Sequence, residues 1–312
     1  MDLPLLRMLQ SMKRIEDDPA CHFQTKTLDL ATFVPKYPNV ILVDQSVDSS
    51  RFPKSFPFVM TPLPVGGVMK CVFVTNTLSR ALSLPINLGN GDTQALNVPQ
   101  PEMLKAAMKG FTVVLKEGLY INPFTMVTEK DILCQGLVLG HLPEYPGFEI
   151  VGLKDVRLLF TEASGSGAIV AAGRIILSNL RVYDFRTPSY GLSAVKIKAL
   201  KANADVKVDL IDVKIHSPGI DGLFIDKSVV SFRGCAITGC KEGLRSDGAQ
   251  ISMASSTVTY NYVRGVVLHY GTKCSITKSR FVGPNMVFVQ GKCDVSISGS
   301  QNFMITCVAL TY

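Results

Sequence analysis

Apolar and polar positions in the C-terminal two-thirds of the chain follow one short frame. In its clearest copy, apolar residues stand at offsets 0, 2, 5 and 7, as Val230, Phe232, Cys235 and Ile237. Alternation at offsets 0 and 2 is typical of a strand with one buried face. The step of three residues from offset 2 to offset 5 indicates a bend. After the bend, the other set of alternating residues points inward, and a second strand follows. Further copies of the frame begin at Ile132, Ile175, Val206, Ile251, Cys274 and Val295.

A third short apolar strand accompanies the frame. Its copies are 222–225, 243–246, 265–268 and 286–289, and three of them begin with a glycine that permits a tight corner. No segment sustains a helical period over a unit of about 21 to 24 residues, which excludes helical-hairpin repeats. Leucine-rich repeats need an Asn-containing leucine frame that is absent from the sequence. Stacked units of this kind predict an all-β fold, a right-handed parallel β-helix from about 111 to 303.

The frame also predicts which side chains share a column along the stack. Phe232 is expected in an inward column with Val208, Met253 and Ile276. Inward serines at 256, 279 and 300 are expected to bond along their own column and to satisfy the backbone at the bend, which is a structural role.

The first hundred residues have a different pattern. Leu5, Leu6, Leu9 and Met12 stand at helical spacing and predict a short amphipathic helix. Eleven of the seventeen prolines lie at or before Pro101, so the rest of this region is expected to be irregular with short extended pieces. We therefore expect an N-terminal arm or packing region at 1–100. A β-helix domain at 101–312 would follow it, with a helical cap near 101–109.

The entry to the predicted solenoid resembles that of pectate-lyase-like β-helix proteins. The segment 110–121 contains the Gly-x-Tyr step Gly118-Leu119-Tyr120, Ala106-Ala107 fits the end of a capping helix, and 148–152 fits an early coil. The resemblance covers about 200 residues. It implies the fold but no single activity, because this superfamily includes lyases, hydrolases, phage and virus fibres, and non-catalytic binding repeats.

One local motif bears on catalysis. His216-Ser217-Pro218-Gly219-Ile220-Asp221-Gly222 resembles the Ser-Pro-Asn-Thr-Asp-Gly step of polygalacturonase-like hydrolases, which need carboxylates from adjacent coils as general acid and base. The paired aspartate, the Gly-His-Gly step and the Arg-x-Lys step of that family are missing here. If the protein were an enzyme, its catalytic residues would be Asp221, Asp226, Asp247 and His269.

Outward positions of the third strand offer a binding surface. Phe224, Arg245, Val267 and Phe288 would form one column that contains an apolar stripe. Such a stripe needs a cover, which could be the N-terminal segment, a neighbouring subunit or a sugar ring. Asp226, Asp247, His269 and Gln290 would form the adjacent polar column.

Composition and charge narrow the function classes. The net charge of +7 includes a predicted basic patch of Lys196, Lys198, Lys201, Lys207 and Lys214, without interleaved aromatic residues or a nucleic-acid motif. The eight cysteines lack metal spacing, so we expect free thiols that are mostly buried, with no metal and no cofactor. No run of apolar residues is long enough to span a membrane, and no signal peptide is evident.

These features favour a non-enzymatic structural or binding subunit of a larger assembly. A virion or capsid-associated protein is the preferred version of this hypothesis. Its partners would be proteins or further copies of itself. A glycan-active or glycan-binding β-helix is the first alternative, and a cytosolic protein-interaction repeat is the second. A location in the cytoplasm or in a virion is expected, and nucleic acid is not expected as a partner.

Overall fold

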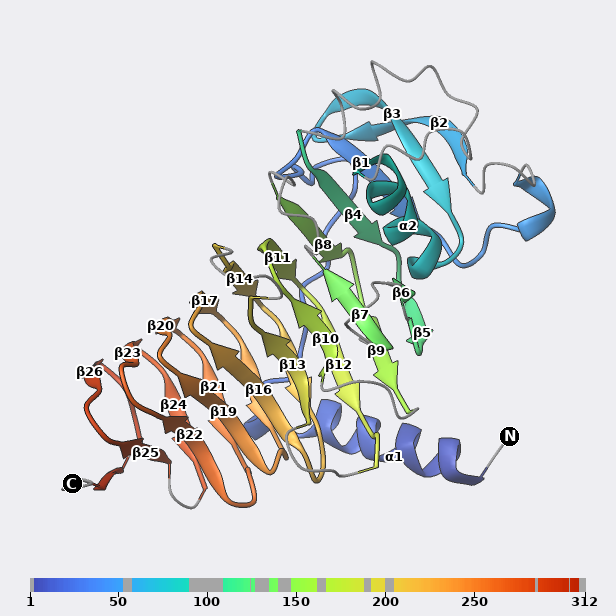
Figure 1. The fold of residues 1–312 in the computed structure, drawn as a ribbon. Helices are drawn as coiled ribbons and strands as arrows, with labels where there is room; N and C mark the ends of the chain where they lie inside the picture. Colours follow the sequence, from blue (N-terminus) through green and yellow to red (C-terminus); the bar gives the residue numbers. More distant parts are fainter. Residues whose placement is uncertain are drawn as a thin grey trace.

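A computed structural model describes residues 3–52, 58–89, 109–123, 125–126, 135–139, 147–161, 167–187, 192–199, 205–283, 286–302 and 304–308. Within these residues the strands form three sheets of eleven, nine and seven strands, called here the long, middle and short sheets. Successive coils add one strand to each sheet, and the coils stack into the solenoid of Figure 1. The prediction of a parallel β-helix is confirmed.

The long sheet runs from the N-terminal region to the last described coil. All its pairings are parallel except that of β2 with β3. In spatial order its strands are β2 (Val59–Val65), β3 (Val68–Thr75), β1 (Asn39–Val43), β4 (Phe111–Leu115), β8 (Phe148–Gly152), β11 (Arg174–Ser178), β14 (Lys207–Ile211), β17 (Val229–Arg233), β20 (Gln250–Ala254), β23 (Lys273–Thr277) and β26 (Asp294–Ser298).

The other two sheets complete each coil. The middle sheet is ordered β27 (Ile305–Val308), β25 (Val287–Gln290), β22 (Arg264–Leu268), β19 (Glu242–Asp247), β16 (Asp221–Asp226), β13 (Ser193–Ile197), β10 (Gly167–Ala171), β7 (Gln135–Leu139) and β6 (Thr125–Met126). The short sheet is ordered β24 (Arg280–Val282), β21 (Thr257–Thr259), β18 (Ala236–Thr238), β15 (Lys214–His216), β12 (Arg181–Asp184), β9 (Val156–Phe160) and β5 (Gly118–Ile121).

The bend between the long and short sheets is made by two residues. The first has a left-handed backbone with φ between 47° and 65°, and the second points inward. In successive coils the first position holds Asn179, Asp212, Gly234, Ser255, Lys278 and Gly299. This is the parity reversal that the step to offset 5 predicted.

Serine hydroxyls link the bends of neighbouring coils, as predicted. The Ser256 hydroxyl accepts from the Cys235 amide at 3.2 Å, and the Ser279 hydroxyl accepts from the Ser256 amide at 3.2 Å. The Ser300 hydroxyl accepts from the Ser279 amide at 3.1 Å. The serine column therefore provides hydrogen-bond acceptors for backbone amides at the bends, where the strand ladders are interrupted.

The predicted register is wrong in two coils. In β14 the partner of Ile175 is Val208, not Val206, so Leu210 rather than Val208 lies beside Phe232. Within one strand a shift of two residues keeps the same parity inward. Because the bend moves with the register, Leu210 points inward and Ile211 outward, which is the reverse of the prediction.

The copy assigned to begin at Ile132 also belongs elsewhere. Residues 132 and 134 lie outside the described residues, while Leu137 and Leu139 belong to β7 in the middle sheet. The long-sheet strand that precedes β11 is β8, in which Phe148 is the partner of Ile175.

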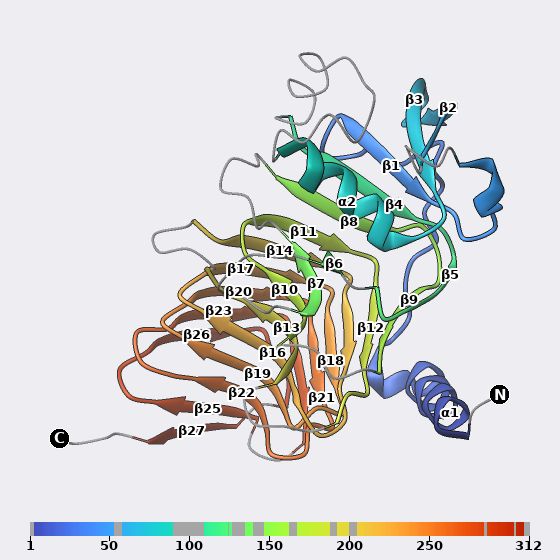
Figure 2. The same cartoon turned by 45° about the vertical axis from the view of Figure 1, so that its right-hand side comes forward.

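The N-terminal region closes one end of the solenoid. β1 pairs in parallel with β4 and with β3, so the long sheet continues into the first hundred residues. Helix α2 (Leu78–Gly89) places Leu78, Ala81 and Leu82 in the main core beside β4 (Figure 2). The predicted cap at 101–109 falls almost entirely outside the described residues, and α2 covers this end of the core.

Helix α1 (Leu3–Asp17) forms as predicted and packs against the solenoid. Met12 is buried, with Leu5, Leu9 and Ile15 packed around it, whereas Leu6 is 40% exposed and does not belong to the buried face. Two short 3-10 helices, η1 (Pro19–Cys21) and η2 (Ser49–Arg51), complete the described elements.

Candidate functional site

The outer face of the middle sheet brings together the predicted binding column. Phe224 pairs with Arg245, Arg245 with Val267, and Val267 with Phe288, so the four side chains are stacked neighbours. Lys196 precedes Phe224 in the same column. The sequence frame located this column correctly because the side-chain period of a strand is two. Its role in binding stays a prediction.

The stripe has a cover that the sequence did not reveal. The Lys196 Nζ lies 5.2 Å from the ring centroid of Phe224, and the Arg264 Cζ lies 4.0 Å from that of Phe288. Arg245 approaches Phe224 from the next coil at 5.9 Å, and Val267 is fully buried. Cations over phenyl faces are attracted by the ring quadrupole. The apolar area of the stripe is therefore largely shielded within the chain itself.

Two carboxylates meet at the edge of this face, where the strands begin. Asp221 and Glu242 are the first residues of β16 and β19, and both are buried. Burial, and then the charge of Glu242, raise the pKa of Asp221 to about 6. Glu242 forms an ion pair with Arg264 Nη1 at 3.3 Å. One carboxyl can thus hold a proton near neutral pH beside a second that is paired with a cation, which is the kind of division that acid–base chemistry uses.

The other catalytic candidates lie at the far end of the same strands. Asp226 and Asp247 are direct partners in the sheet, the first half-buried and the second exposed. His269 follows in the next coil, and burial together with the charge of Arg245 lowers its pKa. Asp221 is the first residue of β16 and Asp226 the last, so the four candidates form two groups at opposite ends of the strands.

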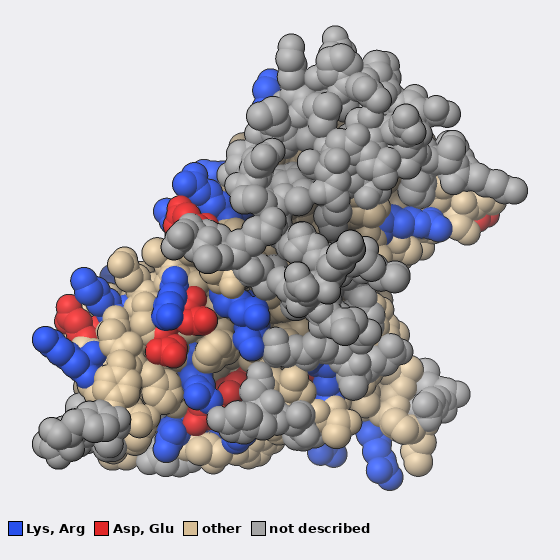
Figure 3. Space-filling model, in the orientation of Figure 1, with Lys and Arg blue, Asp and Glu red and all other residues tan. Residues whose placement is uncertain are grey.

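The five lysines are not brought together in one patch. Lys196 lies on the middle sheet and Lys207 on the long sheet, while Lys214 is buried in the short sheet and donates to the Gly234 carbonyl at 2.5 Å. Lys198 follows β13, and Lys201 lies outside the described residues. Figure 3 shows basic and acidic side chains interspersed on the face in view. Proximity in sequence does not give proximity in space here, because each coil distributes its residues over three sheets.

The N-terminal segment lies on the short sheet, not on the predicted stripe. Phe23 and Cys21 pack with Leu159, Tyr183 and Ala236. The described residues of the N-terminal segment therefore do not cover Phe224 and Phe288.

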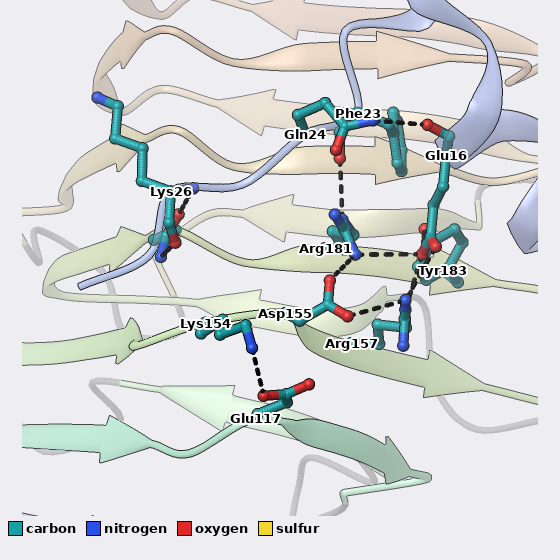
Figure 4. A network of polar contacts seen from close by, with 11 residues as sticks. Glu16, Phe23, Gln24, Lys26, Glu117, Lys154, Asp155, Arg157, Arg181 and Tyr183 are labelled. Carbon is teal, nitrogen blue, oxygen red and sulfur yellow. Dashed lines mark hydrogen bonds and ion pairs between the residues drawn. The ribbon is translucent and has the colours of Figure 1, made fainter. Parts of the chain in front are cut away.

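A polar network anchors this segment, and sequence reasoning did not identify it (Figure 4). Glu16 accepts from Arg157 Nε at 2.8 Å and Nη2 at 3.0 Å, and from the Tyr183 hydroxyl at 2.5 Å. Arg181 donates to the Phe23 carbonyl at 2.9 Å and forms an ion pair with Asp155. Glu16 lies more than 100 residues from Arg157 and Tyr183, as Phe23 does from Arg181, so no local pattern could have located these contacts.

We expect Glu16→Gln to loosen the docking of α1. The variant loses the bidentate charged contact to Arg157, and a hydrogen bond to a charged group contributes about 1.5–3 kcal/mol. Limited proteolysis should then cut within α1 roughly tenfold faster than in the parent, as expected for about 1.4 kcal/mol. Asp17→Asn is the matched control, because Asp17 is the exposed neighbour of Glu16. Equal cutting rates in both variants would show that the network does not hold the helix.

A shallow depression of about 350 Å³ lies on the outer face of the long sheet. Its floor is a column of small hydroxyl side chains contributed by successive strands, and side chains of both charges border it. The polar residues that define it are Lys207, Asp209, Ser231, Gln250, Ser252, Lys273, Ser275, Asp294 and Ser296. Of these residues, sequence reasoning had singled out only Lys207, as a member of the predicted basic patch.

The two ends of the long sheet differ in their free edges. At the N-terminal end, the edge strand β2 contains Pro62 and Pro64, which occupy positions of the same parity. Proline in an edge strand stands where its missing N–H would face solvent, so this edge is protected against a further strand. At the C-terminal end, the edge strand β26 has no proline.

The C-terminal end also exposes the end of the core. Val295 and Ile297 are half-exposed, whereas Cys274 and Ile276 at the same positions one coil earlier are 4% and 0% exposed. Ile305 of β27 is 43% exposed and Met304 beside it 54%. This end of the solenoid therefore exposes apolar side chains of its last coil, and sequence reasoning did not identify it.

The described residues contain no arrangement typical of a metal site, a disulfide or a membrane-spanning helix. No three His, Cys, Asp or Glu side chains in the described ranges converge as metal ligands would. The six cysteines whose side chains are described form no disulfide with one another, and four of them are buried. Among the helices described, none combines the length and the apolar character needed to cross a bilayer.

Comparisons with models of protein families, with curated proteins and with solved structures gave no significant match to this chain.

Proposed function

We propose that the protein is a non-enzymatic structural or binding subunit of a larger assembly in the cytoplasm or in a virion, with a virion or capsid as the preferred setting. Its partners are proteins, other copies of the chain included. One observation supports this most: the two ends of the long sheet are unequal, with a proline-protected edge at β2 and an edge at β26 that has no proline and no neighbouring strand among the described residues. Natural sheets protect the edges that must stay single.

The state of the candidate catalytic residues supports the same proposal. Glu242 is engaged by Arg264, and Asp221 is buried next to it, so neither presents a free carboxylate to a substrate. Asp226 and Asp247 stand in a separate group at the other end of the strands. A hydrolase of this fold would need its acid and base to face one glycosidic bond from adjacent coils.

The native protein should therefore sediment with particles much heavier than its own 33.9 kDa. The measurement is a density gradient of an extract from the source cells, with the protein followed by immunoblot. Purified protein should show no turnover of polyanionic glycans. Two results together would contradict the proposal. The native protein would sediment as a monomer, and the purified protein would hydrolyse such a glycan with an activity that is lost in Asp226→Asn or Asp221→Asn.

Glycan binding without hydrolysis is the second candidate, and the depression on the long sheet favours it. Hydroxyl side chains of Ser231, Ser252 and Ser275 line its floor, and Lys207 and Lys273 border it. Such groups can exchange hydrogen bonds with sugar hydroxyls and attract an acidic sugar. A glycan array read with the parent and with Ser252→Leu would decide this, because the leucine fills the floor while leaving the inward core untouched.

A further inference from the structure

The backbone of β26 has one side that faces out of the solenoid. The Asp294 amide donates to the Thr272 carbonyl at 2.9 Å, and the Ser298 carbonyl accepts from the Lys278 amide at 3.0 Å. In a parallel strand the N–H and C=O of one residue point to the same side, and successive residues alternate. The N–H and C=O of Val295 and Ile297 therefore point away from β23. In the described part of the chain, no strand lies on that side of β26.

In the described part of the chain, the side chains of Val295 and Ile297 lack full cover, and their outward-pointing backbone groups lack a partner strand. Val295 and Ile297 are inward residues of the terminal coil, and they pack against the main core from its end while staying half-exposed. A strand added at this edge would satisfy the backbone and bury the two side chains at the same time.

The sequence of β26 is complementary to itself. In an antiparallel pair of two copies centred on Ser296, Val295 lies opposite Ile297 of the second copy, and their outward-facing backbone groups exchange two hydrogen bonds. Both are inward residues, so the core continues across the joint. Asp294 lies opposite Ser298 of the second copy, so no like charges meet along the strand.

A second copy could also bind head to tail, but the edge at the other end does not favour this. The strand that β26 would meet there is β2, whose prolines remove backbone donors. Head-to-tail contacts also continue into open filaments, whereas a two-fold contact closes after two copies.

We infer that two copies of the protein join at the C-terminal ends of their solenoids, with β26 of one copy antiparallel to β26 of the other and Ser296 at the two-fold axis. The inference rests on the proposed function, because it names the partner of an assembly subunit as the chain itself.

The central residue provides a direct test. At a non-hydrogen-bonded antiparallel pair the two Cα atoms are about 4.5 Å apart, within the range that a disulfide spans. In a Cys71→Ser background, which removes the thiol that is exposed among the cysteines whose side chains are described, Ser296→Cys should form a covalent dimer under mild oxidation. Ser252→Cys is the matched control, because Ser252 is an exposed residue of the same outer column inside the stack. It should stay monomeric on a non-reducing gel.

An edge variant tests the same joint without a new thiol. Val295→Pro removes an N–H that points away from β23, so the parallel ladder within the chain should survive. Light scattering should give about twice the mass of one chain for the parent and the mass of one chain for the variant, with similar melting temperatures. A monomeric parent, a dimer that persists in Val295→Pro, or equal crosslinking of Ser296→Cys and Ser252→Cys would each overturn the inference.

These outcomes separate the inference from the proposed function. A native protein that sediments in particles, while purified Ser296→Cys stays uncrosslinked, keeps the proposed function and rejects self-pairing. A native protein that sediments as a monomer, together with an uncrosslinked variant, rejects both.

Discussion

Phe232→Asp should prevent the chain from folding. Phe232 is the fourth residue of β17, is 2% exposed, and lies between Leu210 and Met253 in the inward column. Truncating a buried phenylalanine alone costs about 3–5 kcal/mol. The variant adds a buried carboxyl without a partner, which costs several kcal/mol more. The sum approaches the whole stability of about 5–15 kcal/mol that natural domains have.

The measurement is soluble expression followed by thermal unfolding monitored by circular dichroism. Val229→Asp is the matched control, since Val229 belongs to the same strand, points outward and is 39% exposed. We expect the control to express and to melt close to the parent, because exposed substitutions usually change stability by within about 0.5 kcal/mol. A Phe232→Asp protein that melts like the parent would show that the inward column is assigned wrongly.

Arg186→Leu should destabilise the fold by about 3–5 kcal/mol, the usual cost of removing one partner of a buried ion pair. The side chains of Arg186 and Asp184 are both fully buried, and Arg186 Nη2 lies 2.7 Å from Asp184 Oδ2. Arg186 also donates to the Ser193 carbonyl at 3.0 Å, so it links the end of β12 to the start of β13. The substitution leaves the Asp184 carboxylate buried without its cation.

The pH dependence of this variant has a definite sign. Burial raises the pKa of Asp184, and Arg186 is the group that opposes this increase. Without Arg186 the folded-state pKa rises further above the unfolded value, so the folded state binds a proton more tightly than the unfolded state does. Stability is then lost as pH increases. The loss caused by Arg186→Leu, measured by urea unfolding, should therefore be smaller at acidic than at alkaline pH.

Two further variants make the result interpretable. Arg174→Leu is the surface control. The side chain of Arg174 is 63% exposed and that of its ion-pair partner Asp205 is 70% exposed, and exposed ion pairs contribute about 0–1 kcal/mol. The double variant Asp184→Val with Arg186→Met removes both charges and should recover much of the stability. A double variant as unstable as Arg186→Leu would show that the loss comes from packing and not from the unpaired carboxylate.

The sequence by itself determined the kind of fold and the direction of most side chains in the last coils. Phe232, Met253 and Ile276 point inward and Phe224, Arg245 and Phe288 point outward, as their alternation predicted. Alternation is a local property of a strand, and the repeat at about 21 to 24 residues multiplies it into a reliable signal. The bend and its serine column followed from the same frame, because each bend is made by two adjacent residues.

Only the tertiary structure decided which residues meet across the coils and across the chain. The register of β14 differs from the predicted one by two residues, because alternation within a strand does not show at which residue the strand ends and the bend begins. The contact of Glu16 with Arg157 joins segments that no local pattern relates. The cations over Phe224 and Phe288, and the burial of Arg186 with Asp184, depend on how side chains pack, which alternation does not specify. The unequal ends also needed the structure, because an edge is the absence of a neighbouring strand, and strand order arises only when the chain is folded.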